Sequence, residues 1–275
     1  MFQTVPVREF EHTYKLIKTL DLDRTKKIKG VSSGRADILP SAFSAIYAFK
    51  KYMNLGDVVV SGSGLRTGLI FNYVVPSTID KPISDVLGFS LNTLSNYYGT
   101  NKAHTEHVVN LSVQLFKQLR VLHKFSRQYL KILKVAATLH DVGNRVQYYN
   151  YEKHSGYIIL NANLNGISHR DIVLASFVAS SSSMEDINIA EWQKYKDLVN
   201  EEDIDTVKKL GIMLRLADCL DRSMTNCVKN INCDILGDSV IMKTEIEGDA
   251  SLEISSAMQM SQDFRKAFKK NLEIL

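Results

Sequence analysis

The feature that most constrains the chain is an apolar helical run, residues 128–139, that ends in the adjacent pair His140-Asp141. Its apolar positions follow helical spacing and predict a buried face, formed by Ile132, Val135, Ala136 and Leu139. Neighbouring residues on a regular helix point about 100° apart, so this pair can face one ion only where the helix ends. Gly143 supplies the backbone freedom expected at such an end. Taken alone, a histidine beside the negative end of the helix dipole explains the pattern equally well.

A second helical segment, residues 102–116, carries two histidines near its start. His104 and His107 are three positions apart and therefore share one face of the helix. One of them can bind an ion while the other orients it or contacts a substrate, and the residues alone do not rank the two. Two solvated histidines are the alternative.

A third helical segment carries Asp218 in an apolar stretch, between Leu216, Ala217 and Leu220. A buried carboxylate without a partner is costly, so Asp218 is expected to meet a cation. Arg215 and Arg222 lie three positions before it and four positions after it. They are either its salt-bridge partners or supporting residues around a metal site.

His104, His140, Asp141 and Asp218 together form a mixed set of imidazole and carboxylate ligands. Imidazole suits transition metals and carboxylate suits hard divalent cations, so we expect Mn²⁺, Mg²⁺, Fe²⁺, Co²⁺ or Zn²⁺ rather than Ca²⁺. Such an ion activates water and polarises a phosphoryl oxygen, with Asp141 as a candidate proton acceptor.

A phosphate group would need cations near that ion. Arg145, Lys153 and His154 follow the His-Asp pair and are the candidates, although solvated loop charges are the alternative. The glycine-rich stretch 61–68 lacks the Lys-Ser/Thr of a nucleotide P-loop and predicts a tight strand-to-helix turn.

Bulk properties exclude several classes. The 275 residues are 45% hydrophobic and 23% charged with a net charge of +4, which is too weakly basic for a dedicated nucleic-acid binder. The three cysteines (Cys219, Cys227, Cys233) include no CxxC pair and are expected to be reduced thiols. No signal peptide or membrane span is visible. We therefore expect a soluble cytoplasmic protein without a membrane partner.

The predicted fold class is mixed α/β and predominantly helical, in three parts: 1–80, 84–228 and 229–275. The first part is predicted to contain helices at 7–20 and 35–54, a buried strand at 57–61, and a boundary at 76–84. The second is almost wholly helical, with loops near 99–103, 143–153 and 180–186. The third is predicted to contain two or three antiparallel strands over 232–255 and a final amphipathic helix over 257–275.

These motifs, taken in order, resemble the exopolyphosphatase / guanosine pentaphosphate phosphatase (Ppx/GppA) family. The stretch GRADILPSAFSAIYAFKKYMNLGDVVVSGSGLRTGLI is similar to the end of its actin-like (ribonuclease H-like) phosphatase domain. The strings AHTEHV, LHDVG, KHSGYIILNANLNGIS and LRLADCLDRS are similar to its HD-type all-α domain. The resemblance thus implies part of an actin-like domain over 1–80, a metal-binding domain over 84–228 and a C-terminal element of strands and helix.

The resemblance also implies a ligand set in which His104 is the first ligand, and it places His154 at a second metal or a phosphate position. Two departures stand out. The family's glycine-rich phosphate loops and catalytic carboxylate precede the region seen here, so we expect a C-terminal part of such a protein. Many relatives have Tyr-His-Arg where this chain has Ser181-Ser182-Ser183, which favours one ion over two.

Three hypotheses follow. The first is a portion of a phosphoanhydride hydrolase acting on polyphosphate, which is favoured, or on guanosine pentaphosphate. The second is a metal-dependent phosphohydrolase of nucleotides or phosphomonoesters centred on the His-Asp site. The third is a non-catalytic module that binds polyphosphate or mediates dimerisation. A homodimer is the expected assembly.

Overall fold

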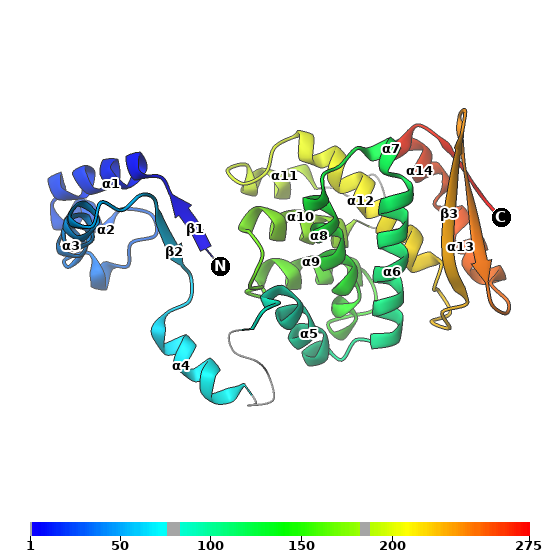
Figure 1. Ribbon diagram of the computed structural model, residues 1–275, viewed down its shortest axis with the longest axis horizontal. Coiled ribbons are helices and arrows are strands. Elements are labelled where there is room, and N and C mark those ends of the chain that lie inside the picture. Colours follow the sequence, from blue (N-terminus) through cyan, green and yellow to red (C-terminus); the bar gives the residue numbers. More distant parts are fainter. Residues whose placement is uncertain (1, 76–82, 182–187) are drawn as a thin grey trace. The chain divides into compact units, whose positions relative to one another are not determined.

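The computed structural model describes residues 2–75, 83–181 and 188–275, in two compact units, Met1–Thr78 and Ile79–Leu275. Within these ranges the chain is predominantly helical with small sheets, which confirms the predicted fold class at that level (Figure 1). No helix in the described ranges is both long enough and apolar enough to cross a bilayer. The three cysteines are unpaired.

The first unit combines short strands with helices. Its elements are β1 (Phe2–Val5), α1 (Val7–Thr19), α2 (Leu22–Lys26), the 3-10 helix η1 (Ser33–Arg35), α3 (Leu39–Tyr52), β2 (Val58–Ser61) and α4 (Leu65–Val74). Strands β1 and β2 pair antiparallel, with Val5 opposite Val58. The helices predicted at 7–20 and 35–54 and the strand predicted at 57–61 are confirmed as elements, the second helix with a later start.

Aromatic pairs hold α1 against α3. Phe10 stacks on Phe43 with ring centroids 5.5 Å apart, and Tyr14 stacks on Tyr47 at 4.3 Å. Both pairs advance by one helical turn in the same direction, so the two helices run parallel. The helical spacing of apolar residues in the sequence reflects this contact.

Many apolar side chains in this unit are exposed. On α3, Ile46 is 47% exposed and Phe49 is 60% exposed. The strand predicted to be buried is also open, with Val59 and Val60 at 59% and 51% exposure. The physical reason is that, within residues 2–75, no further layer packs on the two-stranded sheet and covers these apolar positions.

The second unit is a helical bundle followed by a small sheet. Its helices are α5 (Val86–Tyr98), α6 (Lys102–Gln118), α7 (Arg120–His123), α8 (Arg127–Thr138), η2 (Val142–Arg145), α9 (Tyr151–Asn161), α10 (His169–Ser180), α11 (Ile189–Trp192), η3 (Gln193–Tyr195), α12 (Glu202–Cys219), α13 (Ser251–Gln259) and α14 (Ser261–Phe268). Its strands are β3 (Val228–Leu236), β4 (Ser239–Ile246) and β5 (Asn271–Ile274). The predicted helical stretch 84–228 is confirmed where it is described.

Helices α10 and α12 form the centre of the bundle. Residues 171–179 of α10 and 210–218 of α12 are buried on every face, as expected for a helix enclosed by other helices. Helix α12 packs against α6, α8 and α10, and α9 covers α10. The ends of α6, α8 and α12 therefore meet inside the unit.

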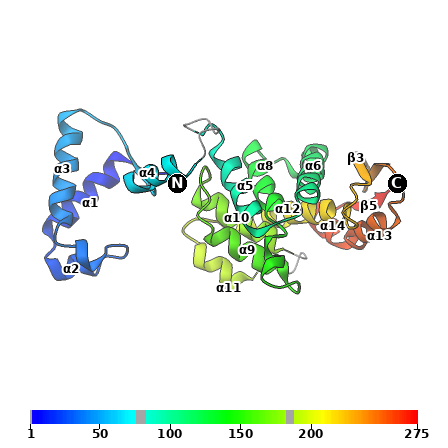
Figure 2. The ribbon, with the colours of Figure 1, turned by 90° about the horizontal axis from the view of Figure 1, so that it is seen from below.

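The C-terminal sheet packs beside α6, with α13 and α14 next to it in both views (Figures 1 and 2). Strands β3 and β4 form the predicted antiparallel hairpin. The predicted third strand was wrong, and the final helix predicted over 257–275 is confirmed only in part, by the end of α13 and by α14. Residues 249–255, expected to be a third antiparallel strand, lead into α13, and the expected final helix ends at Phe268. The chain then forms β5, which pairs parallel to β4.

The physical reason for the error is local. Lys269 takes a left-handed conformation with φ of 57° and ends α14. Leu272 then becomes buried in the sheet, and the amide nitrogen of Leu275 donates to the carbonyl of Met242 at 2.8 Å. Backbone pairing with a distant strand thus overrides a helical pattern of side chains.

The loops predicted near 99–103 and 143–153 are short breaks between helices, the second containing η2. The serine run Ser181-Ser182-Ser183 falls mostly outside the described residues, of which Ser181 is the last before the gap at 182–187. The assignment of the units to actin-like and HD-type domains stays a prediction.

Removing core volume from α10 should destabilise the bundle that positions the helix ends. Leu174 is fully buried, so Leu174→Ala is expected to lower the free energy of unfolding by about 2–5 kcal/mol. Urea denaturation followed by circular dichroism measures this. Leu252→Ala, at a residue 55% exposed on α13, is the control and should change it little. Equal losses in both variants would contradict the assignment of α10 to the core.

Candidate metal centre

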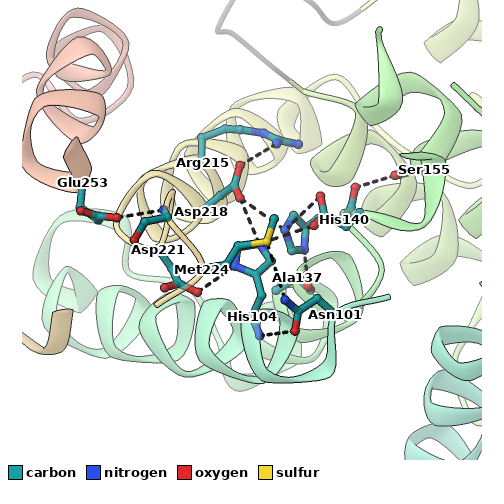
Figure 3. Close-up of polar contacts among 12 residues, drawn as sticks. Asn101, His104, Ala137, His140, Ser155, Arg215, Asp218, Asp221, Met224 and Glu253 are labelled. Carbon is teal, nitrogen blue, oxygen red and sulfur yellow. Dashed lines mark hydrogen bonds and ion pairs between the residues drawn. The ribbon is translucent and has the colours of Figure 1, made fainter. Parts of the chain in front are cut away.

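Three helix ends bring the predicted ligands together in the second unit (Figure 3). His104 lies in the first turn of α6, and Asp218 lies in the last turn of α12. His140 and Asp141 follow the end of α8. The side chains of His104 and His140 are 2% and 0% exposed. The four predicted ligands come from three separate segments of the sequence and form one cluster inside the unit.

The two imidazoles face the same carboxylates. The Nε2 atom of His104 lies 3.5 Å from Asp141 Oδ2 and 3.6 Å from Asp218 Oδ1. The Nε2 atom of His140 lies 3.4 Å from Asp141 Oδ1 and 3.4 Å from Asp218 Oδ1. His104, His140 and Asp141 each offer a donor atom within 4.8 Å of the others, and this buried group could bind a metal ion.

These spacings suit ligands around an ion. An N–H···O hydrogen bond normally spans about 2.7–3.2 Å, so contacts of 3.4–3.6 Å are longer than such bonds. Metal–ligand bonds of about 2.0–2.2 Å place neighbouring donor atoms roughly 3–3.5 Å apart. The Nε2 atom of His140 is buried and has no hydrogen-bond partner among the described residues. The donor set therefore fits a divalent metal.

Both histidines are oriented through their other ring nitrogen. The Nδ1 atom of His104 lies 2.8 Å from Asp221 Oδ2, and that of His140 lies 2.8 Å from the carbonyl of Ala137. An N–H at each Nδ1 donates to these oxygens and leaves the Nε2 lone pair toward the carboxylates. Asp221 is fully buried and also accepts from the amide nitrogen of Asn226 at 2.7 Å.

Close packing against α9 holds the His-Asp turn. The Ser155 hydroxyl donates to the carbonyl of His140 at 2.5 Å and accepts from the amide nitrogen of Gly143 at 2.8 Å. A Cβ on Gly143 would lie 2.0 Å from the carbonyl oxygen of Tyr151. Glycine is therefore required here by this close approach, whereas the sequence suggested backbone freedom as the reason.

Asp218 has a second cation beside it. The Nη1 atom of Arg215 lies 3.5 Å from Asp218 Oδ2. The same buried guanidinium donates to the carbonyls of Ser181 at 2.9 Å and Ala179 at 2.7 Å. Arg215 thus fixes the carboxylate and also holds the C-terminal end of α10 against α12.

The cluster strongly perturbs the pKa values of its members. Burial alone would lower the pKa of His104, but its contact with Asp218, its hydrogen bond to Asp221 and the charge of Asp141 raise it to about 9. For His140, burial is likewise outweighed by Asp141 and Asp218, and its pKa is raised. Burial would raise the pKa of Asp218, but the two histidines and Arg215 hold it well below its usual value. Without a metal, protons on the histidines therefore balance the carboxylates.

His107 and Arg222 lie outside the ligand cluster. Burial lowers the pKa of His107, an effect partly offset by Asp221 and by a hydrogen bond to the backbone of Val228, so this ring faces the start of β3. Arg222 is exposed, and its pKa remains raised because Asp218 and nearby tyrosines outweigh the effect of its burial. His104 rather than His107 therefore meets His140.

The three residues predicted to bind phosphate have different surroundings in the structure. Arg145 donates from Nε to the carbonyl of Tyr98 at 2.5 Å and from Nη2 to that of Gly99 at 3.0 Å, which caps the end of α5. Lys153 is exposed and His154 is half-buried, both in the first turn of α9. Their role in phosphate binding stays a prediction.

Two residues near the cluster were not identified from the sequence. Asp221 lies three positions after Asp218, a spacing that places both on one side of a helix and could have revealed it. Tyr151 is half-buried, and burial together with the charges of Asp218 and Asp141 raises its pKa. Only the three-dimensional approach of α9 reveals this second residue.

The ligand cluster lies in a segment that matches a model of a known protein family. Residues 88–263 match the model described as Ppx/GppA phosphatase, domain III, and this segment contains every residue of the cluster. The chain belongs to the Ppx/GppA phosphatase family. The resemblance stated from the sequence is thereby confirmed.

Several relatives of this Ppx/GppA chain share the name guanosine-5'-triphosphate,3'-diphosphate pyrophosphatase. The protein of Aeromonas salmonicida is 28% identical over 148 residues, which cover 54% of this chain and 29% of that relative. The protein of Aliivibrio fischeri strain ES114 is 26% identical over 155 residues, covering 56% and 29%. That of Vibrio vulnificus is 23% identical over 154 residues, covering 56% and 30%. The matched segment thus spans less than a third of each relative.

Asp221 should strengthen metal binding by orienting His104, although it does not itself contact the ion. Asp221→Asn removes the charge that fixes the His104 ring, and loss of such a partner typically weakens metal binding about 10–100-fold. Calorimetric titration of the metal-free protein with Mn²⁺ measures the change. Asp238→Asn is the matched control, because that side chain is 98% exposed in the β3–β4 turn. Unchanged affinity in Asp221→Asn would remove this residue from the site.

Metal binding should strengthen as pH rises. The His104 pKa of about 9 in the metal-free protein lies above the ordinary value of 6.5, so an incoming ion must displace a proton at neutral pH. Because the pKa of His140 is raised as well, Mn²⁺ affinity is expected to rise at least about tenfold per pH unit below about pH 9 and then to level off. Titration calorimetry in buffers of different ionisation enthalpy measures both affinity and proton release.

The stability of the metal-free protein should decrease as pH rises, whereas metal affinity increases. A folded-state pKa above the unfolded value contributes stability that is fully present below pH 6.5 and is lost as pH rises to about 9. Thermal unfolding of the metal-free protein should therefore show a decreasing midpoint across this window, with the Mn²⁺-loaded protein less affected. A metal affinity that does not vary with pH would contradict the proposed ligand set.

Proposed function

We propose that this Ppx/GppA chain is part of a phosphoanhydride hydrolase and that its cluster is a divalent-metal site for hydrolysis of phosphate bonds. One observation carries the proposal. Two imidazole Nε2 atoms face the carboxylates of Asp141 and Asp218 at 3.4–3.6 Å, and each Nδ1 is held by its own acceptor. This arrangement supports metal binding better than a set of ordinary salt bridges does.

The position of each carboxylate in the cluster indicates its role. A divalent ion bound here would supply positive charge that polarises a phosphoryl oxygen and lowers the pKa of water. Asp141 is the most open of the four side chains at 14% exposure, so it is placed to accept a proton from water on the accessible side. Asp218, paired with Arg215, stays ionised as a ligand.

We propose one ion, from Mn²⁺, Mg²⁺, Fe²⁺, Co²⁺ and Zn²⁺. The cluster has two nitrogen and two carboxylate ligands, a mixture suited to these metals. A second ion would need further ligands near His154. The described part of the serine run contributes the carbonyl of Ser181, which is bonded to Arg215.

The substrate is proposed from chemistry and from the relatives' names. The matched relatives are named for a guanosine tri- and diphosphate compound, which supports a phosphorylated guanosine substrate for the whole protein. The polyphosphate preference expected from the sequence stays the alternative, as does the homodimer. Residues 1–80, which include the first unit, are proposed to belong to an actin-like domain.

A non-catalytic role is the second candidate. The histidines are almost completely buried, and closed sites of this kind also serve structural metals. In that case loss of the ion would lower stability without changing any reaction. Asp141 separates the two roles, because it is both a ligand and the most open side chain.

Asp141→Asn should abolish metal-dependent hydrolysis. We expect the Mn²⁺-loaded chain to release phosphate from pyrophosphate, guanosine pentaphosphate or p-nitrophenyl phosphate, and the variant to be at least about 100-fold slower because one ligand and the proton acceptor are lost. A colorimetric phosphate assay measures this, with elemental analysis of bound metal. Asp23→Asn, at a side chain 90% exposed on α2, is the control.

The outcomes separate the two roles. Equal rates in Asp141→Asn and wild type would contradict a catalytic centre. If the variant also loses its metal and melts at a lower temperature while wild type has no activity, the structural role is favoured. A metal-free wild-type protein that cannot be loaded with any of the named ions would contradict both.

A further inference from the structure

An exposed group of tyrosines lies beside the metal centre. Tyr148 is 68% exposed and Tyr149 is 73% exposed, and their ring centroids are 5.7 Å apart in an edge-on arrangement. Tyr148 is also 6.4 Å from Tyr151, whose ring is tilted by 31° to it. These three residues are called the tyrosine rim below.

The backbone fixes the rim relative to the cluster. Asn150 has a left-handed conformation with φ of 57° at the start of α9, between the two exposed tyrosines and the half-buried Tyr151. The Tyr151 carbonyl approaches Gly143, two residues after Asp141, so closely that no Cβ fits between them. The phenol of Tyr151 interacts electrostatically with Asp218 and Asp141. The rim is therefore connected directly to the candidate metal centre.

Arg222 is a positive charge within electrostatic range of the rim. Arg222 is exposed, and it interacts electrostatically with Asp218, Tyr151 and Tyr148. Across the described residues its guanidinium makes no hydrogen bond and no ion pair within 4.0 Å. By contrast, the guanidinium groups of Arg145 and Arg215 both donate hydrogen bonds to backbone carbonyls. Arg222 is thus the arginine of this region that remains available to an external anion.

We propose that the tyrosine rim and Arg222 bind a nucleoside phosphate, with the base stacked on Tyr148 and the phosphate chain running past Arg222 to the metal centre. This inference rests on the proposed function, because it specifies the substrate class of the same site. Exposed tyrosines are ordinary when scattered singly. Here two of them, with Tyr151, form one surface beside an unpaired arginine and a ligand cluster.

The chemistry favours a nucleoside over inorganic polyphosphate. The face of an aromatic ring is electron-rich and offers little to a phosphate anion, whereas it stacks well on a base. Such stacking tolerates any base, so purine and pyrimidine nucleotides should bind within a few-fold of each other. Arg222 contacts the part that nucleotides and polyphosphate share, so it should contribute to the binding of both.

Binding to the Mn²⁺-loaded chain tests the proposal. Guanosine triphosphate and inorganic triphosphate are titrated against wild type, and the nucleotide is expected to bind about tenfold more tightly. Tyr148→Ala should remove this difference by weakening the nucleotide alone, while Tyr148→Phe should retain it. Arg222→Gln should weaken both ligands. Tyr157→Ala is the matched control, because Tyr157 is 70% exposed on α9 and has no ring partner among the described residues.

Each outcome decides the inference. Equal affinity of wild type for the two ligands, or a nucleotide preference that survives in Tyr148→Ala, would overturn it. Absence of binding by either ligand would overturn it as well. The proposed function is judged separately by hydrolysis of pyrophosphate by the Mn²⁺-loaded wild type, because pyrophosphate has no ring to stack on the tyrosine rim. Active protein with no nucleotide preference would therefore reject the rim and keep the metal centre.

Discussion

The burial of charge where α6, α8 and α12 meet is the constraint on which the second unit depends. Asp141, Asp218 and Asp221 bring three negative charges to this place, and Arg215 returns one positive charge, which leaves two negative charges when the histidines are neutral. Buried charge without compensation is costly. A divalent cation bound here would supply the missing balance. In its absence protons do so, which is why the pKa values of both histidines are raised.

The candidate ligands were predictable because each lies at the end of a strongly patterned helix. A polar side chain in an apolar stretch is informative, and His140 and Asp218 both meet that description. Asp221 was missed because it lies at the end of the apolar run, directly before Arg222 and Ser223, and its burial results from the packing of the loop after α12. Gly143 was identified, but its role was misjudged, since the approach of α9 is a tertiary feature.

The fold was predictable to a similar extent and for similar reasons. Helical spacing identified α1, α3, α6, α8 and α12, whose apolar faces pack locally or against one another. Periodicity failed at residues 249–275, where parallel pairing of β5 with β4 involves partners about thirty positions away. The sequence also predicted a buried strand around Val59, whose exposure depends on whether another layer covers it. Patterns within one segment do not contain that information.

The side chains near the candidate centre fall into two groups: those that are hydrogen-bonded to the backbone and those that are not. Arg145, Arg215 and Ser155 lie close to the candidate centre, yet each is bonded to the backbone and serves to hold helix ends. Arg222 and Tyr148 have no such task, although both have groups capable of strong interactions. The Arg222 guanidinium makes no hydrogen bond or ion pair among the described residues, and the ring of Tyr148 contacts only other tyrosines of the rim. In the proposed function the inner residues would hold the ion, and Arg222 and Tyr148 would select the phosphate compound that reaches it.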